Sequence, residues 1–317
     1  MRPIITITLN PALDLSLSTP QVTPGPKLRC TAPEYDPGGG GINVSRAIRQ
    51  IGGESIAFAA LGGPTGARIA RMLGAEGIEC RAFEAPGETR QSIAVTEETS
   101  GAQYRFVLPG PSWSSEAQAG LLDALAAQVP ESALVVLSGS QPPGLPVGFP
   151  ARLIDALAPK SASLLIDTSG AAMMTLRDRA VGPEVLRLDG EEAAALAGRE
   201  IDTLADLGAF AADLVAEGAA KTVILARGAE GNVLADRGLA APLHAHAPEA
   251  PVVSAVGAGD SFMGAFTLAT ARGLAPGDAL RHGTAAAAAA VRTEATRLCD
   301  RATFEALLPD TTLTELP

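Results

Sequence analysis

Strand-like and helix-like segments alternate along most of this chain, and that order restricts the fold more than any single motif does. Apolar runs predict strands at Ile4–Leu9, Ser55–Leu61, Ala133–Leu137, Ser163–Asp167, near Val185–Leu188 and at Thr222–Ala226. Helical spacing predicts helices from about Asn43, at Gly66–Gly77, Ser115–Gln128, near Pro150–Leu157, and at Glu191–Ala197, Leu204–Glu217, Asp260–Arg272 and Pro276–Val291. Parallel strands need long, usually helical crossovers, so the order predicts a three-layer α/β/α fold around a mainly parallel, doubly wound sheet. Ligands usually bind at the carboxyl edge of such a sheet.

Two β-like stretches interrupt this alternation. Residues 14–36 lack a helical period and contain four prolines, while Gln91–Thr96 and Gln103–Leu108 flank a turn and predict a β-hairpin. We assign approximately 13–36 and 90–108 to a small separate sheet that forms a lid over the site. The whole chain, 1–317, is expected to be one domain.

Charge and cysteine usage exclude several functional classes. The net charge is −11 with no basic stripe, which argues against a nucleic-acid binder. The three cysteines are far apart and show no metal-ligand spacing, so neither a disulfide framework nor a cysteine metal site is expected. No signal-peptide core and no apolar stretch of membrane-spanning length occurs. We therefore expect a cytoplasmic protein that binds no membrane.

A run of four glycines, Gly38–Gly41, precedes the first predicted helix. Glycine lets the backbone approach a ligand closely, and the helix start offers free N–H groups. Asn43 can cap the helix or reach a ligand hydroxyl. Because four glycines are entropically costly, a flexible turn alone explains them poorly. Val44 occupies the third glycine position of a dinucleotide fingerprint, and the chain has no P-loop motif.

A second segment of small residues, Gly257-Ala258-Gly259, ends in Asp260 and opens an apolar helix. Its N–H groups could stabilise charge developing on a transferred phosphoryl group. The adjacent carboxylate could accept a hydroxyl proton, as a catalytic Asp does in phosphoryl transfer. Taken alone, Asp260 fits an ordinary helix N-cap better, and it can fill both roles.

Three further groups are weaker candidates. Asp189 and Glu192 start a helix, where they could hold hydrated Mg²⁺ or form a capping box. Ser140 follows a buried strand, in a position that suits a substrate loop or a plain turn. The isolated cations Lys27, Arg29 and Arg90 could hold a phosphate ester or be solvated on the surface.

The run from Pro37 to Ala47, together with Val256–Ser261, resembles the two signatures of the PfkB carbohydrate kinase family, which has the ribokinase-like fold. Both occur in the family's order and at about its separation, and the resemblance covers nearly the whole chain. It implies that Asp260 is the catalytic base and that Gly257, Ala258 and Gly259 form the anion hole. It further implies that Asp14, Gly39, Gly40, Asn43 and Ser140 hold the sugar.

The resemblance also implies where phosphates and ions bind. Lys27 and Arg90, with Arg29 of a neighbouring subunit, would bind the sugar's own phosphate. ATP would contact Arg187, Asp189, Ala226, Arg227, Gly228 and Gly231. Mg²⁺ would lie near Asp189 and Glu192, and K⁺ near Ser254 and Val256. This chain has Arg187 and Asp189 where the family usually has Lys and Asn.

The expected activity is ATP-dependent phosphorylation of a sugar phosphate, with fructose 6-phosphate as the acceptor. Fructose 1-phosphate and tagatose 6-phosphate are the alternative acceptors, but kinases for these usually carry Lys where this chain has Gly40. From another class, a non-catalytic sugar-phosphate sensor is the alternative, although the intact Asp260 argues against it. The resemblance implies a homodimer formed through the lid sheet.

Overall fold

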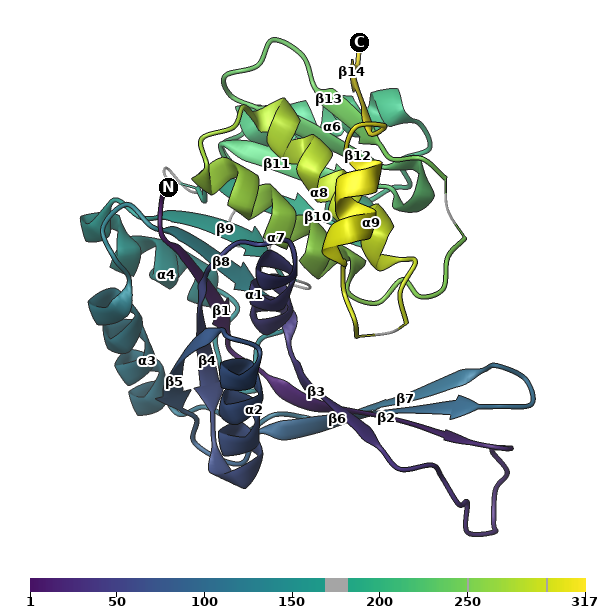
Figure 1. Cartoon of the computed structure of the whole chain (residues 1–317). Coiled ribbons are helices and arrows are strands. Elements are labelled where there is room, and N and C mark those ends of the chain that lie inside the picture. The colour runs from purple at the N-terminus through teal and green to yellow at the C-terminus, as the bar shows by residue number, and fades with distance from the viewer. Residues whose placement is uncertain (169–181, 250, 295) are drawn as a thin grey trace.

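The computed structural model describes residues 1–168, 182–249, 251–294 and 296–317. In that part of the chain the main sheet has ten strands (Figure 1). From edge to edge they are β14 (Thr312–Glu315), β13 (Leu243–His246), β12 (Asn232–Asp236), β11 (Thr222–Ala226), β10 (Val185–Leu188), β9 (Ser163–Asp167), β8 (Leu134–Ser138), β1 (Ile4–Thr8), β4 (Ile56–Leu61) and β5 (Glu79–Glu84). The strands from β11 to β5 pair in parallel, and β12, β13 and β14 continue the sheet antiparallel. The predicted fold class is confirmed.

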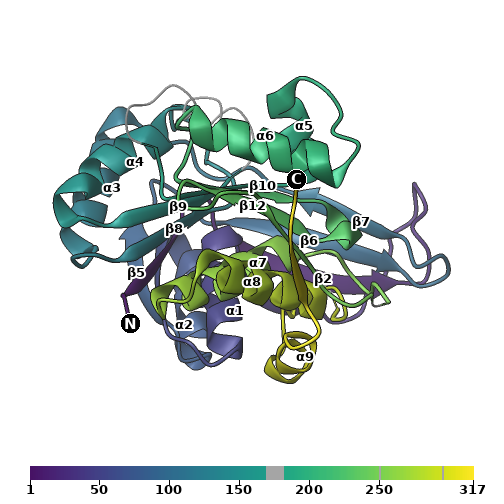
Figure 2. The same cartoon turned by 90° about the horizontal axis from the view of Figure 1, so that it is seen from above.

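Helices cover both faces of this sheet (Figure 2). One layer contains α3 (Ser115–Gln128), α4 (Phe149–Leu157), α5 (Gly190–Ala197) and α6 (Leu204–Ala216). The other contains α1 (Gly40–Gln50), α2 (Gly63–Ala75), α7 (Ala258–Ala271), α8 (Pro276–Ala290) and α9 (Arg301–Leu307). In the described residues, short 3-10 turns lie at Ala158–Lys160 and Gly228–Glu230. None of the helices in the described ranges is long and apolar enough to cross a membrane.

Strand side chains pack with the helices on each face, and a further small cluster joins β4 with α1 and α2. On one face, β-strand residues such as Phe58 and Val135 pack with α3, α4 and α6. On the other, Phe262 and Phe266 of α7 pack with the alanines of α8. Small residues let α7 and α8 approach closely, since a Cβ on Gly283 would lie 2.7 Å from the Phe262 ring. The paired cores hold the carboxyl ends of the strands in fixed positions.

Helix α1 begins at Gly40, three residues before the predicted start. The reason is close backbone contact, which the glycines permit. A Cβ on Gly40 would lie 2.5 Å from the Gly139 nitrogen, and one on Gly41 would lie 2.5 Å from the Ile7 carbonyl oxygen. The start of α1 is thereby pressed against the carboxyl ends of β1 and β8, and any larger side chain would push it away.

A second sheet of four strands protrudes from the body as an arm (Figure 1). Its order is β3 (Glu34–Gly38), β2 (Ala12–Thr19), β6 (Arg90–Glu97) and β7 (Gln103–Val107). The predicted hairpin is confirmed, because β6 and β7 pair antiparallel. We call this unit the small sheet. Strand β2 follows β1 directly and β3 leads into α1, so the small sheet is anchored at the carboxyl edge of the main sheet.

Candidate active site

Asp260 lies at the N-terminal turn of α7 and joins the two glycine-rich segments. Its Oδ2 accepts a hydrogen bond from Asn43 Nδ2 of α1 at 2.9 Å. Its Oδ1 lies 3.4 Å from the Ser138 hydroxyl, at the end of β8. Segments more than 200 residues apart in sequence therefore meet at one carboxylate. No side-chain cap bond is formed at the start of α7, where Gly257 is the N-cap residue, so Asp260 is not a conventional N-cap.

The surroundings of Asp260 raise the pKa of its carboxyl to near neutral pH. The pKa of this carboxyl is raised from 3.8 to about 7, chiefly by burial and also by the nearby charge of Asp167. The bond from Asn43, the charge of Arg187 and the Ser138 hydroxyl act in the opposite direction. A carboxylate that titrates near 7 is suited to general-base catalysis at physiological pH.

Asp167, at the carboxyl end of β9, is a site residue that sequence reasoning missed. Its Oδ1 forms an ion pair with Arg187 and accepts a hydrogen bond from Arg187 Nη1 at 2.7 Å, and its Oδ2 lies 3.4 Å from the Ser138 hydroxyl. Asp167 thus shares Ser138 with Asp260. Its place as the last residue of a predicted strand at the ligand-binding edge was the available signal.

Arg187 projects from β10 into the layer beneath the start of α7. Its guanidinium lies 5.4 Å from the centre of the Phe262 ring and 3.1 Å from where a Cβ on Gly259 would stand. Only 11% of its side chain is exposed. The structure thus places Arg187 against Asp167 and behind the Gly257–Gly259 segment, and its contact with ATP stays a prediction.

The predicted anion hole has the backbone geometry of a helix start. Gly257 adopts a left-handed conformation with φ of 77°, which favours glycine. A Cβ there would lie 2.5 Å from Leu298 Cδ2, so space also excludes a larger residue. The first N–H groups of a helix lack intrahelical acceptors and carry partial positive charge. Gly257, Ala258 and Gly259 can therefore stabilise an anion beside Asp260.

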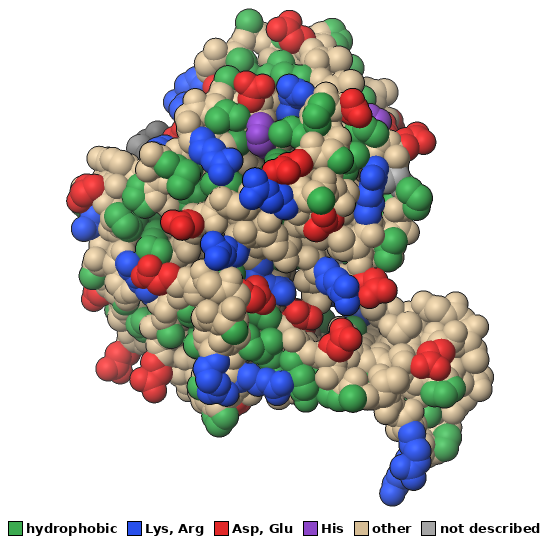
Figure 3. Space-filling model, viewed as in Figure 1, with side chains coloured by type: hydrophobic (Ala, Val, Ile, Leu, Met, Phe, Trp, Pro, Cys, Tyr) green, Lys and Arg blue, Asp and Glu red, His purple; other side chains and the backbone are tan. Residues whose placement is uncertain are grey.

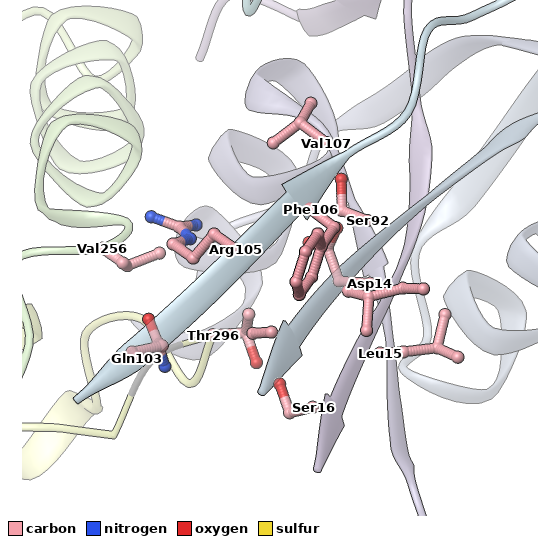
Figure 4. A pocket seen from close by; sticks show the side chains of 12 residues that line it. Asp14, Leu15, Ser16, Ser92, Gln103, Arg105, Phe106, Val107, Val256 and Thr296 are labelled. Carbon is pink, nitrogen blue, oxygen red and sulfur yellow. The ribbon is translucent and has the colours of Figure 1, made fainter. Parts of the chain in front are cut away.

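Asp14 projects from β2 at the base of the small sheet. The pKa of its carboxyl is raised to about 6, chiefly by burial and also by the charge of Asp36, while Arg90 acts in the opposite direction. Asp14 lines a pocket with Arg105, Val256 and Thr296, among other residues (Figure 4). The pocket lies between the small sheet and the segment before α7. Arg105 was not a predicted site residue, and its charge lies within reach of Asp14.

Two glycines and two polar residues lie close to Asp14 or to the neighbouring Asn10. A Cβ on Gly38 would lie 2.1 Å from the Asp14 carboxylate and would displace it, and Gly39 has φ of 114°. Ser140 accepts a hydrogen bond from Asn10 Nδ2 at 3.1 Å. Arg90 Nε donates to the Asn10 carbonyl at 3.3 Å, which brings Arg90 close to Ser140.

Lys27 and Arg29 lie away from this cluster. They belong to the exposed loop that follows β2 at Thr19, whereas Arg90 pairs with Ala12 at the opposite end of that strand. At about 3.3 Å per residue, the strand separates its two ends by roughly 23 Å. The end of the arm carries projecting basic side chains, and acidic and basic groups gather where the arm joins the body (Figure 3). Within one chain the structure does not bring Lys27 and Arg29 to Arg90.

Asp189 and Glu192 form the capping box at the start of α5. Asp189 Oδ1 accepts from the Glu192 N–H, and Glu192 Oε2 accepts from the Asp189 N–H, both at 2.9 Å. The pKa of Glu192 is raised to about 6, chiefly by burial and also by the charges of Asp189 and Asp167, while the hydrogen bond from the Asp189 N–H acts in the opposite direction. A divalent cation would relieve this concentration of negative charge. Among the described residues no three potential ligands form a metal cluster, so Mg²⁺ here would rely on waters and phosphates.

The predicted nucleotide loop follows β11. Arg227 is held within it, because its guanidinium donates to the Ile201 and Asp202 carbonyls and pairs with Glu230 at 2.7 Å. Gly228 and Gly231 have φ of 55° and 100°. The carbonyl of Ala226 lies 3.6 Å from where a Cβ on Gly190 would stand, so this loop adjoins the start of α5.

The predicted potassium residues lie just before Gly257. Ser254 Oγ accepts from the Val256 N–H at 3.2 Å. The N–H groups of Val253 and Ser254 donate to the Val291 carbonyl at 2.7 and 3.2 Å. This segment is therefore fastened to the end of α8, and its potassium site stays a prediction.

Comparison with known proteins agrees with this architecture. The chain is 39% identical over 298 residues to ATP-dependent 6-phosphofructokinase isozyme 2 of Mycobacterium tuberculosis, which covers 94% of this chain and 86% of the relative. Structures of Escherichia coli phosphofructokinase-2 with potassium and with fructose-6-phosphate give TM-scores of 0.91 and 0.89 at 36% and 35% identity, covering 98% of this chain and 99% of theirs. Residues 5–303 match the pfkB family carbohydrate kinase description. On the evidence of its two glycine-rich segments, its fold and these relatives, the chain belongs to the pfkB family of carbohydrate kinases.

Proposed function

We propose that this chain transfers the γ-phosphoryl group of ATP to the C1 hydroxyl of fructose 6-phosphate. The observation that carries the proposal is the position of Asp260, a half-buried carboxylate bonded to Asn43 beside the helix start at Gly257–Gly259. A base and an anion cradle next to each other are the two parts that hydroxyl phosphorylation needs. The fructose-6-phosphate complex of E. coli phosphofructokinase-2 supports the choice of acceptor.

In the proposed reaction, Asp260 removes the proton of the C1 hydroxyl as the oxygen attacks the γ-phosphorus. The bond from that phosphorus to the bridging oxygen of ATP breaks, and ADP leaves. The N–H groups of Gly257–Gly259 stabilise the charge on the transferred group. Asn43 orients the base, and the Ser138 hydroxyl holds its other oxygen. Mg²⁺ bound near Asp189 and Glu192 would neutralise phosphate charge.

The acceptor would lie between Asp14 and Asp260. Asp14 would bind sugar hydroxyls at the pocket lined by Val256 and Thr296. Arg90, near Ser140, is the cation that this chain offers to the sugar's own phosphate. The small sheet, in this proposal, closes over the acceptor as a lid within a single kinase domain of residues 1–317.

The proposal includes a homodimer formed through the small sheet. Its edge strand β7 exposes apolar side chains, with Phe106 53% and Val107 69% exposed. Lys27 and Arg29 would reach a phosphate only in a neighbouring copy, because β2 separates them from Arg90. The tetrameric inhibited form of E. coli phosphofructokinase-2 supports self-association of this fold. Light scattering of the purified protein at several concentrations tests this, and a monomer at all concentrations would contradict it.

An ADP-release assay with four acceptors tests the function. Fructose 6-phosphate, fructose 1-phosphate, tagatose 6-phosphate and unphosphorylated fructose are compared at equal concentration with MgATP. We expect the highest kcat/KM with fructose 6-phosphate. Preference for another phosphorylated sugar would replace the substrate but keep the reaction. Sugar-phosphate binding without any ADP release would favour the sensor. Repeating the assay in Na⁺ and K⁺ salts tests the potassium site.

A further inference from the structure

Arg46 is a buried cation in the first glycine-rich motif to which the proposed reaction gives no role. It lies on α1, one turn beyond Asn43, and only 7% of its side chain is exposed. Its Nη2 pairs with Asp36 of β3 at 3.1 Å, and its Nη1 donates to the Thr296 carbonyl at 3.3 Å. Its Nε pairs with Glu76, after α2, at 3.0 Å. One guanidinium thus joins the small sheet, α2 and the segment after α8.

Thr296 makes a second contact between the small sheet and the segment after α8. Its hydroxyl donates to Asp36 Oδ2 at 2.6 Å, while Arg46 contacts Asp36 Oδ1. Both oxygens of this carboxylate are therefore engaged, one by each partner. Since hydrogen bonds to a partly buried charge are stronger than neutral ones, this arrangement resists separation of the small sheet from the Thr296 segment.

The Thr296 segment also supports the anion hole. Two residues later, Leu298 has φ of 58°, an uncommon value for a branched side chain. The Leu298 side chain fills the space where a Cβ on Gly257 would stand, 2.5 Å from its Cδ2. The Thr293 hydroxyl fixes this turn by donating to the Leu298 carbonyl at 2.9 Å. A displacement of Thr296 would therefore shift Leu298 and, through its side chain, the backbone at Gly257.

On the other side, Asp36 is the direct neighbour of the sugar-binding candidate. Asp36 pairs with Asp14 in the β2–β3 ladder. Asp14, Val256 and Thr296 line one pocket, seen together in Figure 4. The contacts of Arg46 and Thr296 with Asp36 thus lie between the residue proposed to hold the sugar and the segment proposed to hold the phosphoryl group.

We propose that Arg46 and Thr296 are positioning residues that fasten the small sheet to the anion-hole segment through Asp36. The inference rests on the proposed function. By holding Asp14 at a fixed distance from Gly257, they would align the acceptor hydroxyl with the γ-phosphoryl group. A misalignment of about 1 Å can cost about a hundredfold in rate, so a single bond at this junction is enough to affect turnover.

Thr296→Val is the direct test, because it removes the hydroxyl and keeps the side-chain shape. We expect kcat/KM for the sugar phosphate to fall about tenfold, the effect of one hydrogen bond to a charged group. Thr296→Ser should restore most of this loss. Glu76→Gln is the matched control: it weakens the same guanidinium's bond to α2 without touching the small sheet, and kcat/KM should change less than twofold. Thermal unfolding of all three variants is measured alongside.

A double-mutant cycle of Thr296→Val with Asp36→Asn separates positioning from simple destabilisation. Because Asp36→Asn also weakens the contact with Arg46, it should lower kcat/KM on its own. If the Thr296 hydroxyl acts through Asp36, the loss in the double variant should be smaller than the sum of the two single losses. A Thr296→Val variant with lowered melting temperature and unchanged kcat and KM would overturn the inference, as would fully additive losses. A parent protein without kinase activity would instead remove the proposed function itself, so the two failures are distinguishable.

Discussion

The Asp260→Asn substitution should change activity and stability in opposite directions, with a pH dependence set by the buried carboxyl. Burial raises its pKa from 3.8 to about 7. Between these values the folded protein holds a proton that the unfolded chain has released, so rising pH favours unfolding. The shift of about three units corresponds to about 4 kcal/mol, which is fully lost above pH 7. Asparagine does not ionise and escapes this loss.

We therefore expect the stability advantage of Asp260→Asn over the parent to grow by about 2 kcal/mol between pH 5.5 and pH 8. Urea unfolding of both proteins across this range measures the difference in their free energies of unfolding. Because variant and parent are compared at the same pH, the contribution of Asp14 titration is the same in both and cancels. Turnover of the variant should fall by several orders of magnitude while sugar-phosphate binding stays measurable. The parent's kcat/KM should rise through about pH 7 to a plateau. A parent profile that is flat from pH 5 to 8, or a variant advantage that does not depend on pH, would refute the reasoning.

Three further changes test other parts of the site. Gly40→Ala should strongly destabilise the protein and abolish ADP release, because the Cβ would lie 2.5 Å from backbone, whereas Gly74→Ala, with nothing within 4 Å, should raise the melting temperature slightly. Arg187→Met should cost about 3–5 kcal/mol in urea unfolding by leaving Asp167 unpaired, and should shift the pH–activity profile upward; an unshifted profile would contradict the electrostatic role. Arg90→Glu should reduce kcat/KM selectively for phosphorylated sugars, and an equal loss with free fructose would count against its contact with the phosphate.

Local sequence signals predicted β1, β4, β8, β9, β10 and β11 of the main sheet because these strands are short apolar runs and several lead into helical periodicity. They did not predict β5 or β12–β14. The sequence of β5, Glu-Cys-Arg-Ala-Phe-Glu, has three charged residues in six, and all four residues of β14 are exposed, two of them threonines. Such strands form because they pair with an existing edge of the main sheet, and their own sequence indicates a strand only weakly. The start of α1 was placed too late because glycines disfavour a helix unless close packing demands them.

Site residues were predictable where they belong to a local sequence motif. Asp260 and Asn43 are examples, and the structure brings them into contact. The capping box at Asp189 was also predictable, since both partners lie within four residues. The pairings of Asp167 with Arg187 and of Arg46 with the Thr296 carbonyl were not predictable, because the partners are distant in sequence and no local pattern indicates them. The roles of the site residues in binding and catalysis stay predictions.

Strand β1 lies between β4 and β8, and this position affects folding during synthesis as well as the stability of the finished sheet. One edge of β1 can pair as soon as Ile56–Leu61 has emerged from the ribosome, but the other has no partner until Leu134–Ser138 follows. At about 5–20 residues per second, that edge stays open for on the order of ten seconds. Its Ile-Ile-Thr-Ile-Thr sequence is rich in β-branched residues and free of charge, so the nascent chain passes through a stage in which a strand of the future sheet's interior exposes an aggregation-prone edge.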